Sequence, residues 1–84
     1  MQATQQATNT AIAMPVLKRN NTGEAVRFLQ QLLIATHYLT SDAFDAKFNA
    51  TTEEAVKYFQ ANNNLKPDGI VGDKTWRALG AAFV

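Results

Sequence analysis

Cysteine is absent from this 84-residue chain, and histidine occurs once, at His37. Without cysteine the chain can form no disulfide, no thiolate nucleophile and no sulfur-ligated metal site. A zinc site built on His37 would need further ligands that converge on it. We therefore interpret His37 as a surface residue at the end of a helix, and we expect neither a cofactor nor a metal site.

The chain also has little net charge and no long apolar run. Eight basic residues against seven acidic ones leave a net charge of +1, far from the concentrated positive field that is typical of nucleic-acid-binding domains. Lys74 and Arg77 are too few to anchor phosphates and read bases, so no nucleic-acid partner is expected. No stretch approaches the roughly 20 apolar residues of a membrane-spanning helix, and residues 1–13 lack the regions of a signal peptide. We predict no membrane insertion.

What the chain does contain is enough apolar residues, 46% of the total, for one small core. Residues 1–14 are rich in Gln, Thr, Ala and Asn and offer little to bury, so we interpret them as a flexible tail or a linker remnant. Residues 15–84 are then the folded domain, which we expect to be a monomer.

Apolar residues recur at helical spacing in three segments of this domain. The helices are expected over residues 24–36, 52–62 and 74–82. The residues expected to cap their N-termini are Thr22, Thr51 and Asp73. No segment shows a strand pattern strong enough to build a sheet. We therefore predict an all-α fold, a small three-helix orthogonal bundle.

An internal repeat links the first two helices. The segment from Thr22 to Gln30 returns thirty positions later, with five of nine residues identical. A second echo relates Asp45-x-x-Phe48-x-x-x-Thr52 to Asp68-x-x-Val71-x-x-x-Thr75. We predict a loop–helix unit used repeatedly, in which Gln30 and Gln60 hydrogen-bond to loop backbone. Asp45 and Asp68 are interpreted as turn residues that accept backbone N–H bonds, and not as paired catalytic carboxylates.

Three ordered motifs resemble those of a known family. They are Leu17-(x)5-Gly23-x-x-Val26-x-x-Leu29-Gln30-x-x-Leu33, Thr52-x-x-Ala55-Val56-x-x-Phe59-Gln60 and Leu65-x-Pro-Asp68-Gly69-Ile-Val71-Gly72-x-x-Thr75-Trp76-x-x-Leu79. They are similar to the peptidoglycan-binding domain, a three-helix module found beside bacterial cell-wall hydrolases. The resemblance implies a non-catalytic domain that binds peptidoglycan and anchors itself or a linked cell-wall enzyme. It also implies a location in the cell wall or the periplasm.

The first loop departs from the family pattern. Ala46 and Asn49 stand where the family more often has glycine, and Ala adopts a positive φ poorly. We therefore expect this loop to be reshaped. A reshaped loop favours an alternative function, a protein–protein docking module that reuses the same fold.

A ligand groove is predicted between the loop after the first helix and the turn before the third. The residues expected to furnish its donors and acceptors are Tyr38, Asp45, Asn62, Asn64, Asp68 and Arg77. Hydroxyls, amides and charged groups of this kind suit the hydroxyls, amides and carboxylates of peptidoglycan. Trp76 lies on an apolar stripe with Leu79, and we predict that it packs in the core.

Overall fold

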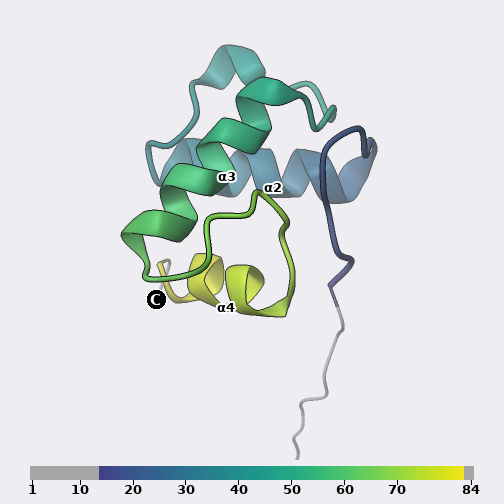
Figure 1. The fold of residues 1–84 in the computed structure, drawn as a ribbon. Helices are drawn as coiled ribbons and strands as arrows, with labels where there is room; N and C mark the ends of the chain where they lie inside the picture. Colours follow the sequence, from purple (N-terminus) through teal and green to yellow (C-terminus); the bar gives the residue numbers. More distant parts are fainter. Residues whose placement is uncertain (1–13, 83–84) are drawn as a thin grey trace, which may run out of the picture.

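The computed structural model describes residues 14–82, which form three α-helices and one short 3₁₀ helix. Their bounds are α2 (Glu24–Ala35), η2 (Ser41–Ala43), α3 (Ala50–Asn62) and α4 (Asp73–Ala81). Figure 1 shows α3 crossing over α2, with α4 below both in that view. The prediction of an all-α, three-helix fold is confirmed, whereas the tail predicted at residues 1–14 lies, except for Met14, outside the described residues.

The core is built from the apolar faces of all three helices together with residues of the connecting loops. Trp76 of α4 is only 8% exposed, which confirms its predicted place in the core. Its ring stacks on Phe28 of α2 with ring centroids 6.0 Å apart. The indole Nε1–H donates to the carbonyl oxygen of Pro15 at 2.8 Å, so the one polar atom of this buried ring has a partner. None of the helices within residues 14–82 has the length and apolar character needed to cross a membrane.

The helices begin beside the predicted capping residues and not at them. The observed N-caps are Gly23, Asn49 and Gly72, so the predictions of Thr22, Thr51 and Asp73 are wrong. Asn49 is the one whose side chain caps, since its Oδ1 accepts from the Thr52 backbone N–H at 3.1 Å. Asn49 has φ −101° and needs no left-handed backbone, which explains why glycine is dispensable at this position.

Helices α2 and α3 end in the same way, with a residue in the left-handed conformation. His37 follows α2 with φ 70°, and Asn64 follows α3 with φ 60°. The backbone N–H of the next residue then reaches back to the helix, from Tyr38 to the Leu33 carbonyl at 2.8 Å and from Leu65 to the Gln60 carbonyl at 2.9 Å. The three consecutive asparagines at positions 62–64 thus lie where α3 ends.

Two isolated β-bridges tie the N-terminal segment to the two long loops. Leu17 pairs with Val71, exchanging two backbone hydrogen bonds of 3.1 and 2.8 Å, and Thr22 pairs with Lys47. Val71 is thus held in an extended conformation before α4. Thr22 does not cap α2 because Gly23, the residue after it, occupies the N-cap position.

The first loop is organised around the buried side chain of Gln30. Its Oε1 accepts from the backbone N–H groups of Asp45 and Ala46 at 3.1 and 2.8 Å. Its Nε2 donates to Asp45 Oδ1, to the Lys47 carbonyl and to Thr52 Oγ1, each at 3.0 Å. Every polar atom of this fully buried amide therefore has a partner, as buried polar groups require.

Gln60 organises the second loop by the same pattern. Its Oε1 accepts from the Gly69 N–H at 2.9 Å. Its Nε2 donates to Asp68 Oδ1 at 3.3 Å, to the Ile70 carbonyl at 2.9 Å and to Thr75 Oγ1 at 3.1 Å. The predicted bonds from both glutamines to loop backbone are confirmed. Each copy of the sequence repeat supplies one of these two glutamines.

The first loop is not reshaped, contrary to expectation. Ala46 adopts φ 64°, close to the φ of 75° at the equivalent Gly69, and it keeps the bond to Gln30. Gly69 has a second reason to be glycine, because a Cβ there would lie 3.0 Å from Glu53 Cγ. The hydrogen bond to Gln30 holds Ala46 in a conformation that alanine adopts only at a cost.

Replacing either buried glutamine by the similarly shaped methionine is expected to lower the free energy of unfolding by about 3 kcal/mol, because buried loop groups lose their partners. Gln31→Met, on the exposed side of α2, is the matched control and should change it by less than about 0.5 kcal/mol. Urea unfolding measures all three variants. Equal stability of Gln60→Met and Gln31→Met would contradict this role.

Ala46→Gly is expected to raise the free energy of unfolding by about 1 kcal/mol, because glycine removes the cost of the left-handed conformation. The same change at Ala61, an exposed position inside α3, should lower it by about 1 kcal/mol. Thermal and urea unfolding of the two variants test the opposite signs, and a destabilised Ala46→Gly would show that the loop carries no strain.

Candidate functional site

The loop after α2 and the first half of α3 enclose a surface groove of about 450 Å³. Its lining residues are Tyr38, Leu39 and Thr40 from the loop, and Ala50, Thr51, Glu54, Ala55 and Tyr58 from α3. We call it the Tyr38–Tyr58 groove. Both aromatic rings carry a hydroxyl, and the other polar groups are two threonine hydroxyls and one carboxylate. The groove thus combines apolar faces with hydrogen-bonding groups.

Tyr38 is held in place from two sides. Its ring packs edge-on against Phe59 of α3, with centroids 5.4 Å apart and an interplanar angle of 86°. Its hydroxyl accepts a hydrogen bond from Asn62 Nδ2 at 3.0 Å. The position of its backbone is set by the left-handed His37 before it. This wall of the groove is therefore formed before any ligand arrives.

A second hollow, of about 370 Å³, lies between the end of α3 and the start of α4. Its polar lining includes Asn64, Asp68, Lys66 and Lys74. Asp68 Oδ1 accepts from the Ile70 backbone N–H at 2.9 Å, so one of its oxygens is already used to shape the turn. We call this region the Asn64–Lys74 hollow.

The structure brings some of the predicted site residues together. Tyr38 and Asn62 share a hydrogen bond at the Tyr38–Tyr58 groove. Asn64 and Asp68 line the Asn64–Lys74 hollow. All four residues thus lie near the C-terminal end of α3, but they belong to two separate features and not to one continuous groove.

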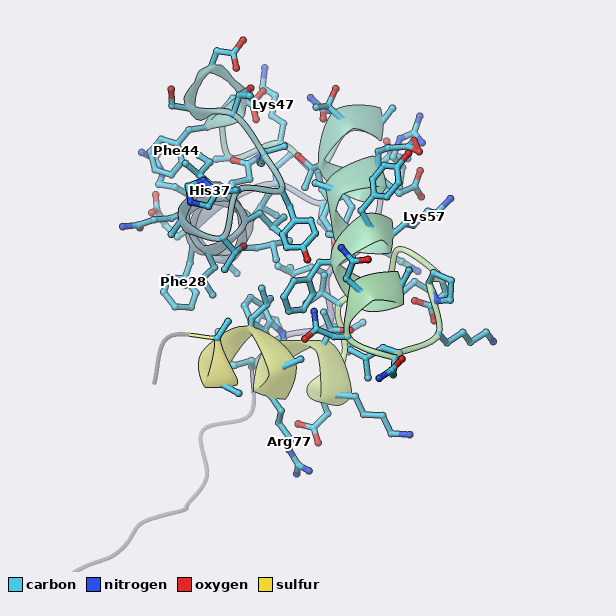
Figure 2. All side chains as sticks on the ribbon, turned by 90° about the vertical axis from the view of Figure 1, so that its left-hand side faces the viewer. Phe28, His37, Phe44, Lys47, Lys57 and Arg77 are labelled. Atoms are coloured by element: carbon cyan, nitrogen blue, oxygen red, sulfur yellow. The ribbon has the colours of Figure 1, made fainter. Side chains whose placement is uncertain are left out.

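Asp45 and Arg77 lie apart from these residues and from each other. The Asp45 carboxylate binds the backbone N–H of Lys47 at 3.0 Å, and Figure 2 shows Lys47 and Arg77 at opposite ends of the molecule. Arg77 extends outward from α4 and pairs with Asp73, one turn earlier, at 3.2 Å. The two charges cannot bind one small ligand together.

Hydrogen bonds to the Asp45 carboxylate favour its ionised form. The Gln30 amide and the Lys47 backbone N–H both donate to it, and these bonds lower the pKa of Asp45 below its ordinary value of 3.8. An ionised carboxylate accepts hydrogen bonds and is a poor general acid at neutral pH. Its chemistry is that of a structural turn residue.

Metal ligands do not gather anywhere in residues 14–82, where no group of three or more His, Asp or Glu side chains is placed to hold an ion. His37 is exposed and follows α2, as its interpretation as a helix-end residue requires. Figure 2 shows it on the same side of the molecule as Phe44.

Sequence reasoning missed Tyr58, Glu54 and Thr51 as site residues. Tyr58 is 61% exposed although it is a large aromatic residue. Its repeat partner Phe28 stacks on Trp76. Of these two equivalent aromatic residues, one therefore has a partner in the core and the other faces outward.

The family model described as "Putative peptidoglycan binding domain" matches residues 22–79, which include both glutamine-centred loops and all three α-helices up to Leu79. The chain belongs to this family of peptidoglycan-binding domains. The resemblance read from the three sequence motifs is thereby confirmed.

Solved structures similar to this peptidoglycan-binding domain include the SleB N-terminal domain. It is 32% identical, with a TM-score of 0.81, and the match covers 88% of this chain and all of that one. The endolysin of the Burkholderia phage AP3 is 40% identical, with a TM-score of 0.75 over 81% of this chain and 26% of its own. In the endolysin the matching fold is therefore one part of a longer protein.

A curated relative is the "Uncharacterized protein in bpoA1 3'region" of Kitasatospora aureofaciens. It is 42% identical over 66 residues, which are 77% of this chain. The match covers 55% of that relative, so this chain spans about half of its length.

Asp45→Asn tests the structural role of this carboxylate in the peptidoglycan-binding domain. Since its pKa is lower in the folded than in the unfolded chain, the ionised group stabilises the fold above the unfolded pKa of about 3.9, and this contribution disappears as the pH falls through the folded pKa. The free energy of unfolding should thus fall more steeply on acidification in the wild type than in Asp45→Asn. Urea unfolding from neutral to acidic pH measures both slopes, and equal slopes would contradict the shift.

Proposed function

We propose that this domain binds peptidoglycan without covalent chemistry and holds itself, or an enzyme linked to it, at the bacterial cell wall. Membership of the family, over the segment that contains both loops, is the observation that carries this proposal. The cell wall or the periplasm is the compartment in which such binding takes place.

The surface of the domain supports this function. The Tyr38–Tyr58 groove and the Asn64–Lys74 hollow present hydroxyl, amide, carboxylate and ammonium groups beside apolar surface. Binding sites for small and polymeric ligands typically join a mainly apolar wall to a few polar groups that fix orientation. Both features are shallow openings on a small domain, which suits contact with a long insoluble polymer.

We infer that the domain performs no hydrolysis itself. The candidate acid–base carboxylates Asp45 and Asp68 each accept a backbone N–H two residues ahead and a glutamine amide. Both are therefore parts of turns. A domain of this kind contributes by tethering, because a linked enzyme stays at high effective concentration near its polymer.

The docking alternative rested on a reshaped first loop, and that loop keeps the same bonds to Gln30 that the second loop makes to Gln60. This argument for a changed partner is therefore lost. Peptidoglycan remains the proposed ligand, and a monomer is the proposed state in which the domain binds it.

Co-sedimentation with purified insoluble sacculi tests the proposal. The domain should enter the pellet in proportion to the amount of sacculi, should stay in solution with insoluble cellulose, and should leave the turbidity of the sacculi unchanged. If it stays in the supernatant with sacculi and is retained only by a protein partner, the docking function replaces wall binding. Loss of turbidity on incubation with the purified domain would show hydrolysis.

A further inference from the structure

We propose that the Tyr38–Tyr58 groove is the subsite for the sugar backbone of the wall polymer, and that it takes the amino-sugar units and not the stem peptides. The inference rests on the proposed function, since it assigns one component of peptidoglycan to one surface. The groove volume of about 450 Å³ falls within the range of about 300–1,000 Å³ for small-ligand sites.

The first argument is the outward-facing ring of Tyr58. This side chain is 61% exposed, and no hydrogen bond among residues 14–82 involves its hydroxyl. Tyr38 lies across the groove, braced by Phe59 and Asn62. A tyrosine offers an apolar face and a polar tip at little entropic cost, and this combination matches a pyranose ring, which has apolar C–H faces and a rim of hydroxyls.

The second argument is the charge of the lining. The groove has one charged residue, Glu54, and no cationic side chain. The three ion pairs found within residues 14–82 join Arg19 to Glu53, Arg27 to Glu24 and Arg77 to Asp73, so none of them neutralises Glu54. Sugar hydroxyls donate well to such a carboxylate. The carboxylates of a stem peptide would be repelled by it and would find no partner.

The third argument is the apolar floor. Leu39, Ala50 and Ala55 lie between the polar groups of the groove, and Leu39 and Ala55 are buried beneath it. The methyl of an N-acetyl group is a small apolar substituent that such a floor accommodates. By contrast, the Asn64–Lys74 hollow is lined by four charged side chains, those of Lys66, Lys74, Asp68 and Asp73, so the less charged groove is the better match for an uncharged N-acetyl sugar.

The test titrates the labelled domain with an uncharged oligomer of N-acetylglucosamine as the glycan probe, and separately with the free stem peptide, while backbone amide shifts are recorded. The glycan should shift the amides of residues 38–40 and 50–58. Tyr58→Ala should weaken glycan binding about tenfold, because an aromatic contact is lost, and Glu54→Gln should also weaken it.

Two matched controls lie outside the groove. Phe44→Ala removes another half-exposed aromatic ring, and Glu24→Gln neutralises another exposed glutamate. Both should bind glycan as the wild type does. Thermal unfolding of each variant separates loss of contact from loss of fold, and Tyr58 is exposed enough that the fold should survive its truncation.

Two outcomes would overturn the assignment. One is that the stem peptide alone shifts the groove amides, and the other is that folded Tyr58→Ala binds glycan like the wild type. If the wild type and Tyr58→Ala sediment equally with intact sacculi, the groove assignment fails while wall binding stands. If the wild type does not sediment with sacculi, both fail together.

Discussion

The carboxamide group of a buried glutamine is the centre of this fold, and it occurs twice. A neutral amide carries two donors and an acceptor oxygen, and burial makes each unpaired one costly. Gln30 and Gln60 satisfy these atoms with the loop that follows in the chain, from Asp45 to Lys47 and from Asp68 to Ile70. The conformation of each loop is thus set by polar pairing to a helix, which complements a core that a chain of this length can only keep small.

The helices and the two glutamine-centred loops could be predicted from the sequence because each follows from a local or repeated pattern. Apolar spacing located the three helices, and equivalent positions in the internal repeat suggested that Gln30 and Gln60 bind loop backbone. The capping residues could not be predicted in the same way, because apolar spacing shows the buried face of a helix but not the residue at which it begins. Thr22 lies one residue before the Gly23 cap, and Asp73 lies one residue after the Gly72 cap. Ala46 shows the same limit, since a bond to Gln30 outweighs its local preference.

The grouping of surface residues depends on which faces of the helices meet, and a single sequence contains little of that information. Tyr38 and Asn62 were predicted together and do touch, because the ends of α2 and α3 both close near Phe59. Arg77 was placed with them from its position in the chain, yet it lies on the outer side of α4. Tyr58 lies at the edge of the apolar stripe, and the sequence does not show which loop residues line the same groove.

The attachment of the N-terminal segment has a mechanical consequence. The Pro15 carbonyl oxygen accepts a hydrogen bond from the Trp76 indole, and Leu17 pairs with Val71 through two backbone hydrogen bonds. A force applied to the chain at Pro15 therefore acts first on α4 and on the loop before it, and only then on α2. Trp76 in turn stacks on Phe28 of α2, so this ring pair is a contact through which the load passes from α4 to α2.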